Sequence, residues 1–349
     1  MIRTPVCDLM EIDHPIALGG MGSIYSPDLV AAVSNAGGLG SLPCALLDPK
    51  TLRQELQALT GRTSRPYNVN FFCHQPPASD GARETAWRTA LSPYFRELGV
   101  DAASVPTGPL IAPVGADAID ALAEFRPAVV SFHFGLPNDD LLARVRALGA
   151  KIISSATTVE EARWLEAHGV DAIVAQGLEA GGHRGMFLSD DTTTQIGTLA
   201  LLPQVVRAVR IPVVAAGGIA DARGVAAAMA LGAAGVQVGT AFLLCHEATP
   251  NAIYRAALKG EAANHTALTN VLSGRLARAI SNRIVRELGP ISAIAPEFPL
   301  ALGPILALRA KAEGQGSHEF SALWCGQNAS GCREIAAAEL MRELAAAFR

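Results

Sequence analysis

Eight short apolar segments, each followed by a segment with a helical pattern, most constrain how this chain of 349 residues can fold. Helix signals lie between the apolar segments; Ser26 and Pro27, for example, are an N-cap and a first-turn residue before the helix expected over 28–35. Strands that alternate with helices indicate a parallel sheet, and eight such units are typical of a closed barrel. We therefore predict the α/β class with a (β/α)8 TIM barrel, whose strands are expected at residues 15–18, 39–42, 67–72, 129–133, 151–156, 171–175, 212–216 and 235–238.

The chain is long enough for this barrel and a smaller second domain, since half of its residues are hydrophobic and a large core is available. We expect the barrel to span residues 1–243, with an insertion at about 73–128 that carries a helical piece near 82–98. A smaller, mainly helical lid domain is expected over 244–316. Residues 317–349 are expected to end in an alanine-rich helix that packs back on the barrel.

Charge and cysteine spacing exclude several kinds of partner. The net charge is -4, and no basic cluster occurs, so neither nucleic acid nor an anionic membrane is expected as a partner. The uncharged run 224–245 is as long as a membrane span, but its glycines divide it into helix, turn and strand. The six cysteines lie far apart without zinc-ligand spacing, which indicates reduced thiols in a cytoplasmic protein and no metal. Residues 1–12 carry charges and no continuous apolar core, so we expect no signal peptide. The sequence leaves monomer and homodimer both open.

Residues 175–185 have the composition of an active-site loop. His183 lies there among four glycines, directly after the strand expected at 171–175. Glycines allow backbone to approach a ligand closely, and an isolated imidazole titrates near neutral pH. On these residues alone, a tight turn with a solvent-facing histidine is the alternative. His74 and His168, by contrast, are expected to be ordinary surface or turn residues.

Two glycine turns predict a phosphate site at the same end of the barrel. Gly217-Gly218 follows the seventh expected strand and Gly239-Thr240 follows the eighth, where backbone N–H groups of such barrels bind anions. Plain tight turns are the alternative. The chain has neither a dinucleotide fingerprint nor a Walker lysine, so the phosphate is expected to belong to FMN or a sugar phosphate. FMN fits better, because residues 20–22 offer a flat ring a close backbone surface.

Several motifs in one order resemble those of the nitronate monooxygenases, formerly called 2-nitropropane dioxygenases. The resemblance spans nearly the whole chain and includes residues 33–40, 68–70, 175–185, 216–219 and 237–240. Residues 130–135 and 179–185 are most similar to motifs of the class I bacterial and fungal enzymes. The resemblance implies an FMN-dependent barrel that oxidises alkyl nitronates, and neutral nitroalkanes as well, with O₂ to a carbonyl compound and nitrite.

The same resemblance implies roles for individual residues. His183 matches the base that takes the α-proton of a neutral nitroalkane, whereas a nitronate is already deprotonated. His133 matches a second pocket histidine, and Tyr254 remains as a pocket phenol. The residues expected to hold FMN or to lie beside its ring are Gly20, Met21, Gly22, Asn70, Gln176, Gly181, Gly182, Gly217, Gly218, Gln237, Val238, Gly239 and Thr240.

The chain departs from the family pattern in two places. Relatives read Gln-Ala-Pro-Met at the end of the first strand, whereas residues 18–21 read Leu-Gly-Gly-Met and resemble related flavin-dependent quinone and enoyl reductases. An NAD(P)H-dependent flavin reductase of quinones or enoyl thioesters is therefore the alternative function. Relatives also place tyrosines and a lysine over the substrate, where this chain has Phe298, Leu302 and Leu306, which predicts a more apolar substrate. A flavin-free barrel isomerase or synthase and a flavin-binding protein without activity also stay open.

Overall fold

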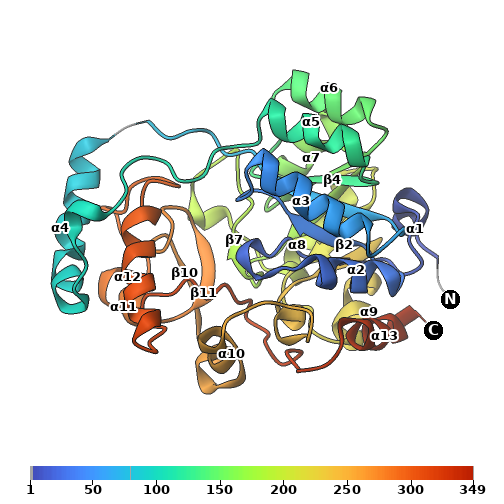
Figure 1. The fold of residues 1–349 in the computed structure, drawn as a ribbon. Coiled ribbons are helices and arrows are strands. Elements are labelled where there is room, and N and C mark those ends of the chain that lie inside the picture. Colours follow the sequence, from blue (N-terminus) through green and yellow to red (C-terminus); the bar gives the residue numbers. More distant parts are fainter. Residues whose placement is uncertain (1–2, 79, 349) are drawn as a thin grey trace.

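A ring of parallel strands forms the centre of the molecule in the computed structural model, which describes residues 3–78 and 80–348 (Figure 1). Around the ring the strand order is β1-β9-β8-β6-β5-β4-β3-β2, and a parallel bridge between Ala17 and Leu39 joins the two ends of the sheet. The predicted α/β class and TIM barrel are confirmed. The eight strands are β1 (Ile16–Leu18), β2 (Gly40–Pro43), β3 (Tyr67–Phe72), β4 (Val129–His133), β5 (Lys151–Ala156), β6 (Ala172–Gln176), β8 (Val213–Ala216) and β9 (Gly235–Val238).

Helices cover the outside of the barrel, and five of the eight begin at a side-chain cap. The Ser26 side chain accepts a hydrogen bond from the Leu29 N–H, and Thr158 does the same for Glu161. Each N-cap satisfies a backbone donor that the first turn of a helix leaves free. The covering helices are α2 (Pro27–Asn35), α3 (Pro49–Thr60), α5 (Ala116–Phe125), α6 (Asp139–Ala147), α7 (Val159–Ala167), α8 (Thr198–Ala208), α9 (Ala222–Ala230) and α13 (Ala337–Ala345), of which α13 lies against α2 and is followed by the 3₁₀ turn η6 (Ala346–Phe348).

The N-terminal end of the barrel is closed by α1 (Pro5–Met10). Val6 and Met10 pack with Val129, Val174 and Val214, which point into the barrel from its strands. Because this end is filled by core side chains, a ligand has access only at the opposite end, where the carboxyl ends of the strands lie. The uncharged run 224–245 lies in α9, β9 and the 3₁₀ turn η4 (Thr240–Leu244). Among the described residues, no helix combines the length and apolar character that crossing a membrane requires.

A second packing unit, which we call the cover, lies beside the carboxyl end of the barrel (Figure 1). Its core joins Trp87 and Leu91 to Val271, Ile305 and Phe320. It contains helices and also a three-stranded antiparallel sheet in the order β10-β11-β7, in which β7 is Gly182–His183. Its elements are α4 (Gly81–Leu98), β10 (Thr266–Thr269), β11 (Ala277–Ile280), α11 (Arg283–Leu288) and α12 (Leu302–Gly314), with α10 (Ala252–Lys259) and the 3₁₀ turn η5 (Glu261–Asn264) next to it.

The region expected as an insertion, 73–128, is divided between the two units. Its helix α4 packs on α12 in the cover, whereas α5 packs on α3 and is the barrel helix between β3 and β4. The 3₁₀ turn η2 (Ala102–Ser104) lies between them, and η1 (Gly22–Ile24) and η3 (Thr192–Thr194) occupy loops after β1 and β7. The cover is therefore built from two parts of the chain, α4 in the first half and the elements from β10 to α12 in the second half. The domain limits expected from the sequence stay a prediction.

Candidate active site

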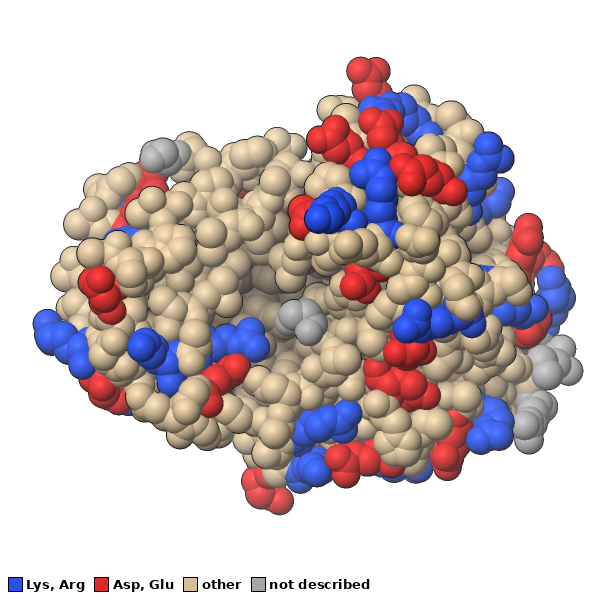
Figure 2. Space-filling model, in the orientation of Figure 1, with Lys and Arg blue, Asp and Glu red and all other residues tan. Residues whose placement is uncertain are grey.

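A cavity of about 490 Å³ opens at the carboxyl ends of the barrel strands, between the barrel and the cover. Its size lies within the range of small-molecule sites. Figure 2 shows a hollow between the two units. Most of the residues predicted for the site line this one cavity, although they come from six different barrel strands or from the segments that follow them: Gly20, Met21, Gly22, Asn70, His133, Gln176, Gly181, Gly182, His183, Gly217, Gly218, Gln237, Gly239 and Thr240.

The short strand β7 (Gly182–His183) fixes the position of His183. It pairs with β11, so that His183 lies opposite Ala277 in a sheet of the cover. The imidazole Nε2 lies 2.9 Å from Ser273 Oγ. Gly182 precedes it with a φ of 76°, a left-handed conformation that favours glycine. The histidine that the sequence singled out is therefore held between the barrel and the cover.

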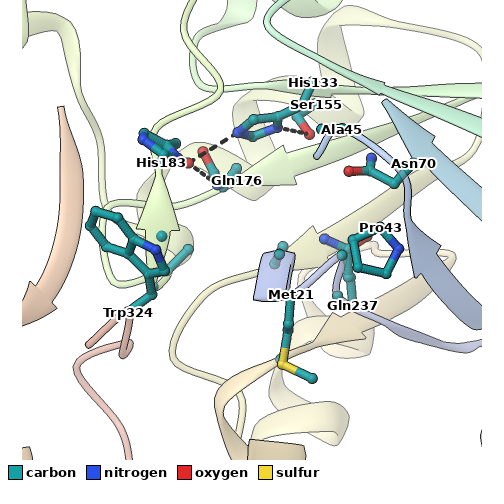
Figure 3. A pocket seen from close by; sticks show the side chains of 18 of the residues that line it. Met21, Pro43, Ala45, Asn70, His133, Ser155, Gln176, His183, Gln237 and Trp324 are labelled. Carbon is teal, nitrogen blue, oxygen red and sulfur yellow. Dashed lines mark hydrogen bonds between the residues drawn. The ribbon is translucent and has the colours of Figure 1, made fainter. Parts of the chain in front are cut away.

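An aromatic cage surrounds the His183 ring. The ring centroids of Trp324 and Phe298 lie 5.1 and 5.2 Å away, and Phe134 and Phe72 lie at 5.9 and 6.0 Å. Figure 3 shows the Trp324 side chain beside His183. Burial in this cage, together with repulsion from His133 and Arg275, lowers the pKa of His183 to about 3. At neutral pH the imidazole is therefore uncharged.

His133 and Gln176 hold the backbone of His183 (Figure 3). His133 Nε2 lies 3.1 Å and Gln176 Nε2 3.0 Å from the His183 carbonyl oxygen. Because a carbonyl only accepts, His133 must carry its proton on Nε2, and its Nδ1 then accepts from the Ser155 hydroxyl at 3.0 Å. Burial lowers the pKa of His133 to about 4. His133 thus holds the loop through Nε2 and is itself fixed to β5 through Nδ1, and Gln176 Oε1 adds a bond from the Gly185 N–H at 2.7 Å.

The glycine turns after β8 and β9 present backbone donors to the cavity. Gly217 and Gly218 have φ values of 118° and 73°. Within the described residues, the N–H groups of Gly218, Gly239 and Thr240 donate to no acceptor. The first turn of α9 differs, since Asp221 caps it by accepting from the Gly224 N–H at 2.8 Å. Any anion bound here would therefore meet the loop N–H groups and not the end of α9.

Amide side chains and Met21 line the opposite side of the cavity. Asn70 Nδ2 donates to Ser131 Oγ at 2.8 Å, and this leaves its Oδ1 beside Gly20. The Gln237 side chain points into the cavity and has no hydrogen bond to the described residues (Figure 3). Met21 lies next to Gly239. These groups provide polar atoms around a flat, glycine-rich surface.

Three expectations about individual residues need correction. Tyr254 does not line the cavity; its ring is packed among apolar side chains, and its hydroxyl donates to the Trp324 carbonyl at 2.5 Å. Val238 packs in the hydrophobic core, because neighbouring residues of a strand point to opposite faces and Gln237 points into the cavity. His74 is not on the surface: only 3% of it is exposed, and its ring lies 4.8 Å from that of Phe298.

The outer wall of the cavity is largely apolar. Phe298, Leu302 and Leu306, which the sequence placed over the substrate, all line it, together with Leu110 and Ile111. In the described part of the chain, the acidic and basic side chains at the cavity are those of Glu179 and Arg309. Glu179 accepts from the Thr198 N–H at 2.8 Å and from its hydroxyl at 2.7 Å, and Arg309 Nε donates to Glu313 at 2.7 Å.

Sequence reasoning missed four of these residues. Ser273 and Trp324 reach His183 only because β11 pairs with β7 and with Trp324, and nothing local in the sequence indicates those contacts. Ser155 was part of an expected strand without a role. Arg309 could have been predicted at the cavity, because it lies three residues after Leu306 and hence on the same helix face. Among the described residues, no group of histidine, cysteine or carboxylate side chains has the arrangement of a metal site.

Comparison with known proteins places this site in a family context. A family model described as "Nitronate monooxygenase" matches residues 3–347. A nitronate monooxygenase of Pseudomonas aeruginosa is 44% identical over 350 residues, covering 98% of this chain and 98% of the relative.

Two solved structures have a similar fold. A nitroalkane oxidase from Streptomyces ansochromogenes superposes with a TM-score of 0.87 at 37% identity, covering 98% of this chain and 96% of the other. FabK from Thermotoga maritima gives a TM-score of 0.74 at 29% identity and covers 100% of this chain and 96% of its own. The similarity therefore includes the cover as well as the barrel.

Proposed function

The chain belongs to the nitronate monooxygenase family, and from this premise we propose that it is an oxidoreductase that oxidises alkyl nitronates with O₂. The reaction depends on FMN and yields a carbonyl compound and nitrite; neutral nitroalkanes are further substrates. The observation that carries this proposal is the uncharged imidazole of His183, which lines the cavity inside an aromatic cage. A neutral base among apolar side chains is suited to small acidic carbon compounds and their anions.

The residues at the cavity fit FMN. The positive φ values of Gly217 and Gly218, and the unpaired N–H groups of Gly218, Gly239 and Thr240 within the described residues, suit a phosphate. The polar atoms of Asn70 and Gln237, with the backbone of residues 20–22, suit the edge and face of a flavin ring. When bound, FMN supplies the electron transfer and O₂ chemistry that side chains lack.

His183 takes the α-proton of a neutral nitroalkane, and Ser273 decides which ring nitrogen does so. Ser273 Oγ lies 3.3 Å from the Arg275 carbonyl oxygen, which can only accept. If the single hydroxyl proton goes there, His183 must donate from Nε2 to Ser273 Oγ. The lone pair is then on Nδ1, which has no hydrogen bond to the described residues. In that tautomer Nδ1 is the atom that accepts the α-proton.

A nitronate requires no proton transfer, so the chain has only to bind and orient it. The rings of Phe72, Phe134, Phe298 and Trp324 give it apolar surroundings next to His183. His133 and Gln176 hold the loop that carries His183 by its carbonyl, and they keep the imidazole at the cavity wall. The loop is thereby positioned before substrate binds.

An absorbance spectrum of the purified protein, followed by anaerobic mixing, tests the proposal. We expect a flavin spectrum that is bleached when ethyl nitronate is added without O₂. The alternative is an NAD(P)H-dependent flavin reductase, which Gly19-Gly20-Met21 favours. Fast anaerobic bleaching by NADH, with none by the nitronate, would replace the proposed function with this alternative. A protein that binds no flavin would contradict both.

A further inference from the structure

The mouth of the cavity carries exposed leucines from three separate segments. Leu46 precedes α3, Leu110 precedes α5 and Leu306 lies on α12, and their exposed fractions are 52%, 43% and 38%. The other large hydrophobic residues with high exposure among the described residues lie elsewhere and line no part of this cavity: Leu188, Leu199, Ile291 and Ile294. Exposed apolar side chains that gather at the rim of a pocket indicate a surface that a ligand covers.

The apolar surface continues from the rim to the aromatic cage. Leu302 packs with Phe298 and Ile111, and Phe298 lies 5.2 Å from the ring of His183. Leu302 and Leu306 are one helical turn apart on α12, so they form one stripe along the cavity wall. A continuous apolar path therefore leads from the proposed base to the outside. A substrate whose reacting end lies at His183 would send its remaining atoms along this path.

We propose that this path binds a linear alkyl chain, so that the preferred substrates are nitronates of medium and long primary nitroalkanes. This inference rests on the proposed function, whose substrate it specifies. A linear chain suits the site because the path is apolar along its length. Arg309 is the cation at this wall, and its Nε is paired with Glu313. Figure 2 shows few charged side chains on the surface above the hollow, which agrees with an apolar occupant.

The expected gain can be stated for each methylene group. Burial of one CH₂ from water raises affinity by about fourfold, and somewhat less where the chain stays partly exposed at the rim. The kcat/KM values of the holoenzyme should therefore rise along the nitronates of nitroethane, 1-nitrobutane, 1-nitrohexane and 1-nitrooctane. The dissociation constants of the matching saturated carboxylates should fall along the same series. A carboxylate is planar and anionic like a nitronate but does not react.

The test uses polar variants at the rim and a matched control. Leu306→Gln and Leu110→Gln are expected to flatten the dependence on chain length in both series, since each puts an amide on the path. Leu199→Gln, which changes an exposed leucine on α8 outside the cavity, is expected to keep the wild-type slope. The dependence of kcat/KM on chain length is measured from O₂ consumption with the nitronates. The dependence of the dissociation constant is measured by isothermal titration calorimetry with the carboxylates.

Four results would overturn the inference. Equal affinity for all chain lengths would contradict the alkyl path. A dependence on chain length that neither rim variant changes would contradict it as well. Dicarboxylates that bind more tightly than monocarboxylates of equal length would indicate an anion contact with Arg309 instead. A wild-type dimer that Leu306→Gln converts to monomers, with an unchanged slope, would make the leucines an interface between two copies. Carboxylate binding without any nitronate oxidation would contradict the proposed function and leave the alkyl path supported.

Discussion

Replacement of His183 by asparagine removes the proposed base while it preserves the contacts that hold the loop. The loop is held through the carbonyl of residue 183, which accepts from Gln176 at 3.0 Å and from His133 at 3.1 Å. The pairing of β7 with β11 likewise uses only backbone. We therefore expect His183→Asn to fold and to retain its flavin.

The size of the effect follows from the state of the imidazole. Its pKa of about 3 lies four units below pH 7, so only roughly one molecule in 10⁴ carries a protonated His183 there. Loss of a general base costs about 10²–10⁴ in rate, and a base of such low pKa falls at the lower end. The hydrogen bond to Ser273 is lost as well, but it joins two side chains of the protein and contributes to folding stability, so its loss should change the rates on all substrates alike and only slightly.

Steady-state kinetics on paired substrates separate these two contributions. We expect kcat/KM for ethyl nitronate to change little, because this anion needs no proton transfer. For neutral nitroethane the loss should be about 10²-fold greater. His133→Asn serves as the contrast, because His133 acts on the loop through the His183 carbonyl and should lower both rates by the same factor. An equal loss on both substrates in His183→Asn would refute the assignment of His183 as base.

Three further changes have defined outcomes. Gly218→Val should lower the flavin-to-protein ratio after dialysis, because a φ of 73° at the proposed phosphate site costs valine about 1–2 kcal/mol. An unchanged ratio would argue against the phosphate site. Tyr254→Phe should lower the free energy of unfolding by about 1 kcal/mol, because the hydrogen bond to the Trp324 carbonyl is lost, and it should leave KM unchanged. An altered KM would show that Tyr254 does contact the substrate. The free energy of unfolding should also fall as pH decreases from about 6.5 toward 4, because His133 and His183 stay neutral in the folded protein but gain protons in the unfolded chain. Each histidine contributes about 1.4 kcal/mol for each pH unit. Urea midpoints that do not change with pH across this window would contradict the lowered pKa values of the two histidines.

The barrel could be predicted from the sequence because its signals are local. Residues 67–72, 129–133 and 151–156 were expected as strands and have those bounds in the structure. Capping residues such as Ser26 and Thr158 mark helix starts through contacts only three residues long. The convergence of residues at the strand ends then follows from the parallel topology itself. For these reasons the amino-acid pattern, together with the family resemblance, predicted the glycines, amides and histidines that meet at the cavity.

The remainder depends on contacts between distant segments. The strand β7 has two residues, too few for any periodic pattern, and its pairing with β11 spans about ninety residues of sequence. Only its packing on α12 assigns the helix α4 to the cover, and the sequence does not indicate that packing. Tyr254 was misplaced for the same reason, since a phenol near a cavity and a phenol bonded to a backbone carbonyl look alike in sequence. Periodicity predicts elements, but it does not predict which surfaces they bury.

The cage around His183 bears on which substrate the site favours. Two of its aromatic rings, Phe298 and Trp324, belong to segments after the barrel, so the cover supplies much of the burial that lowers the imidazole pKa. A base with a pKa of about 3 is always available but has little driving force to remove a proton, because efficient proton transfer needs a pKa near the working pH. The same neutral ring is no obstacle to an anion that arrives deprotonated. We therefore expect nitronates to react faster than neutral nitroalkanes, and a change that opens the cage, such as Trp324→Ala, to narrow that difference by raising the His183 pKa.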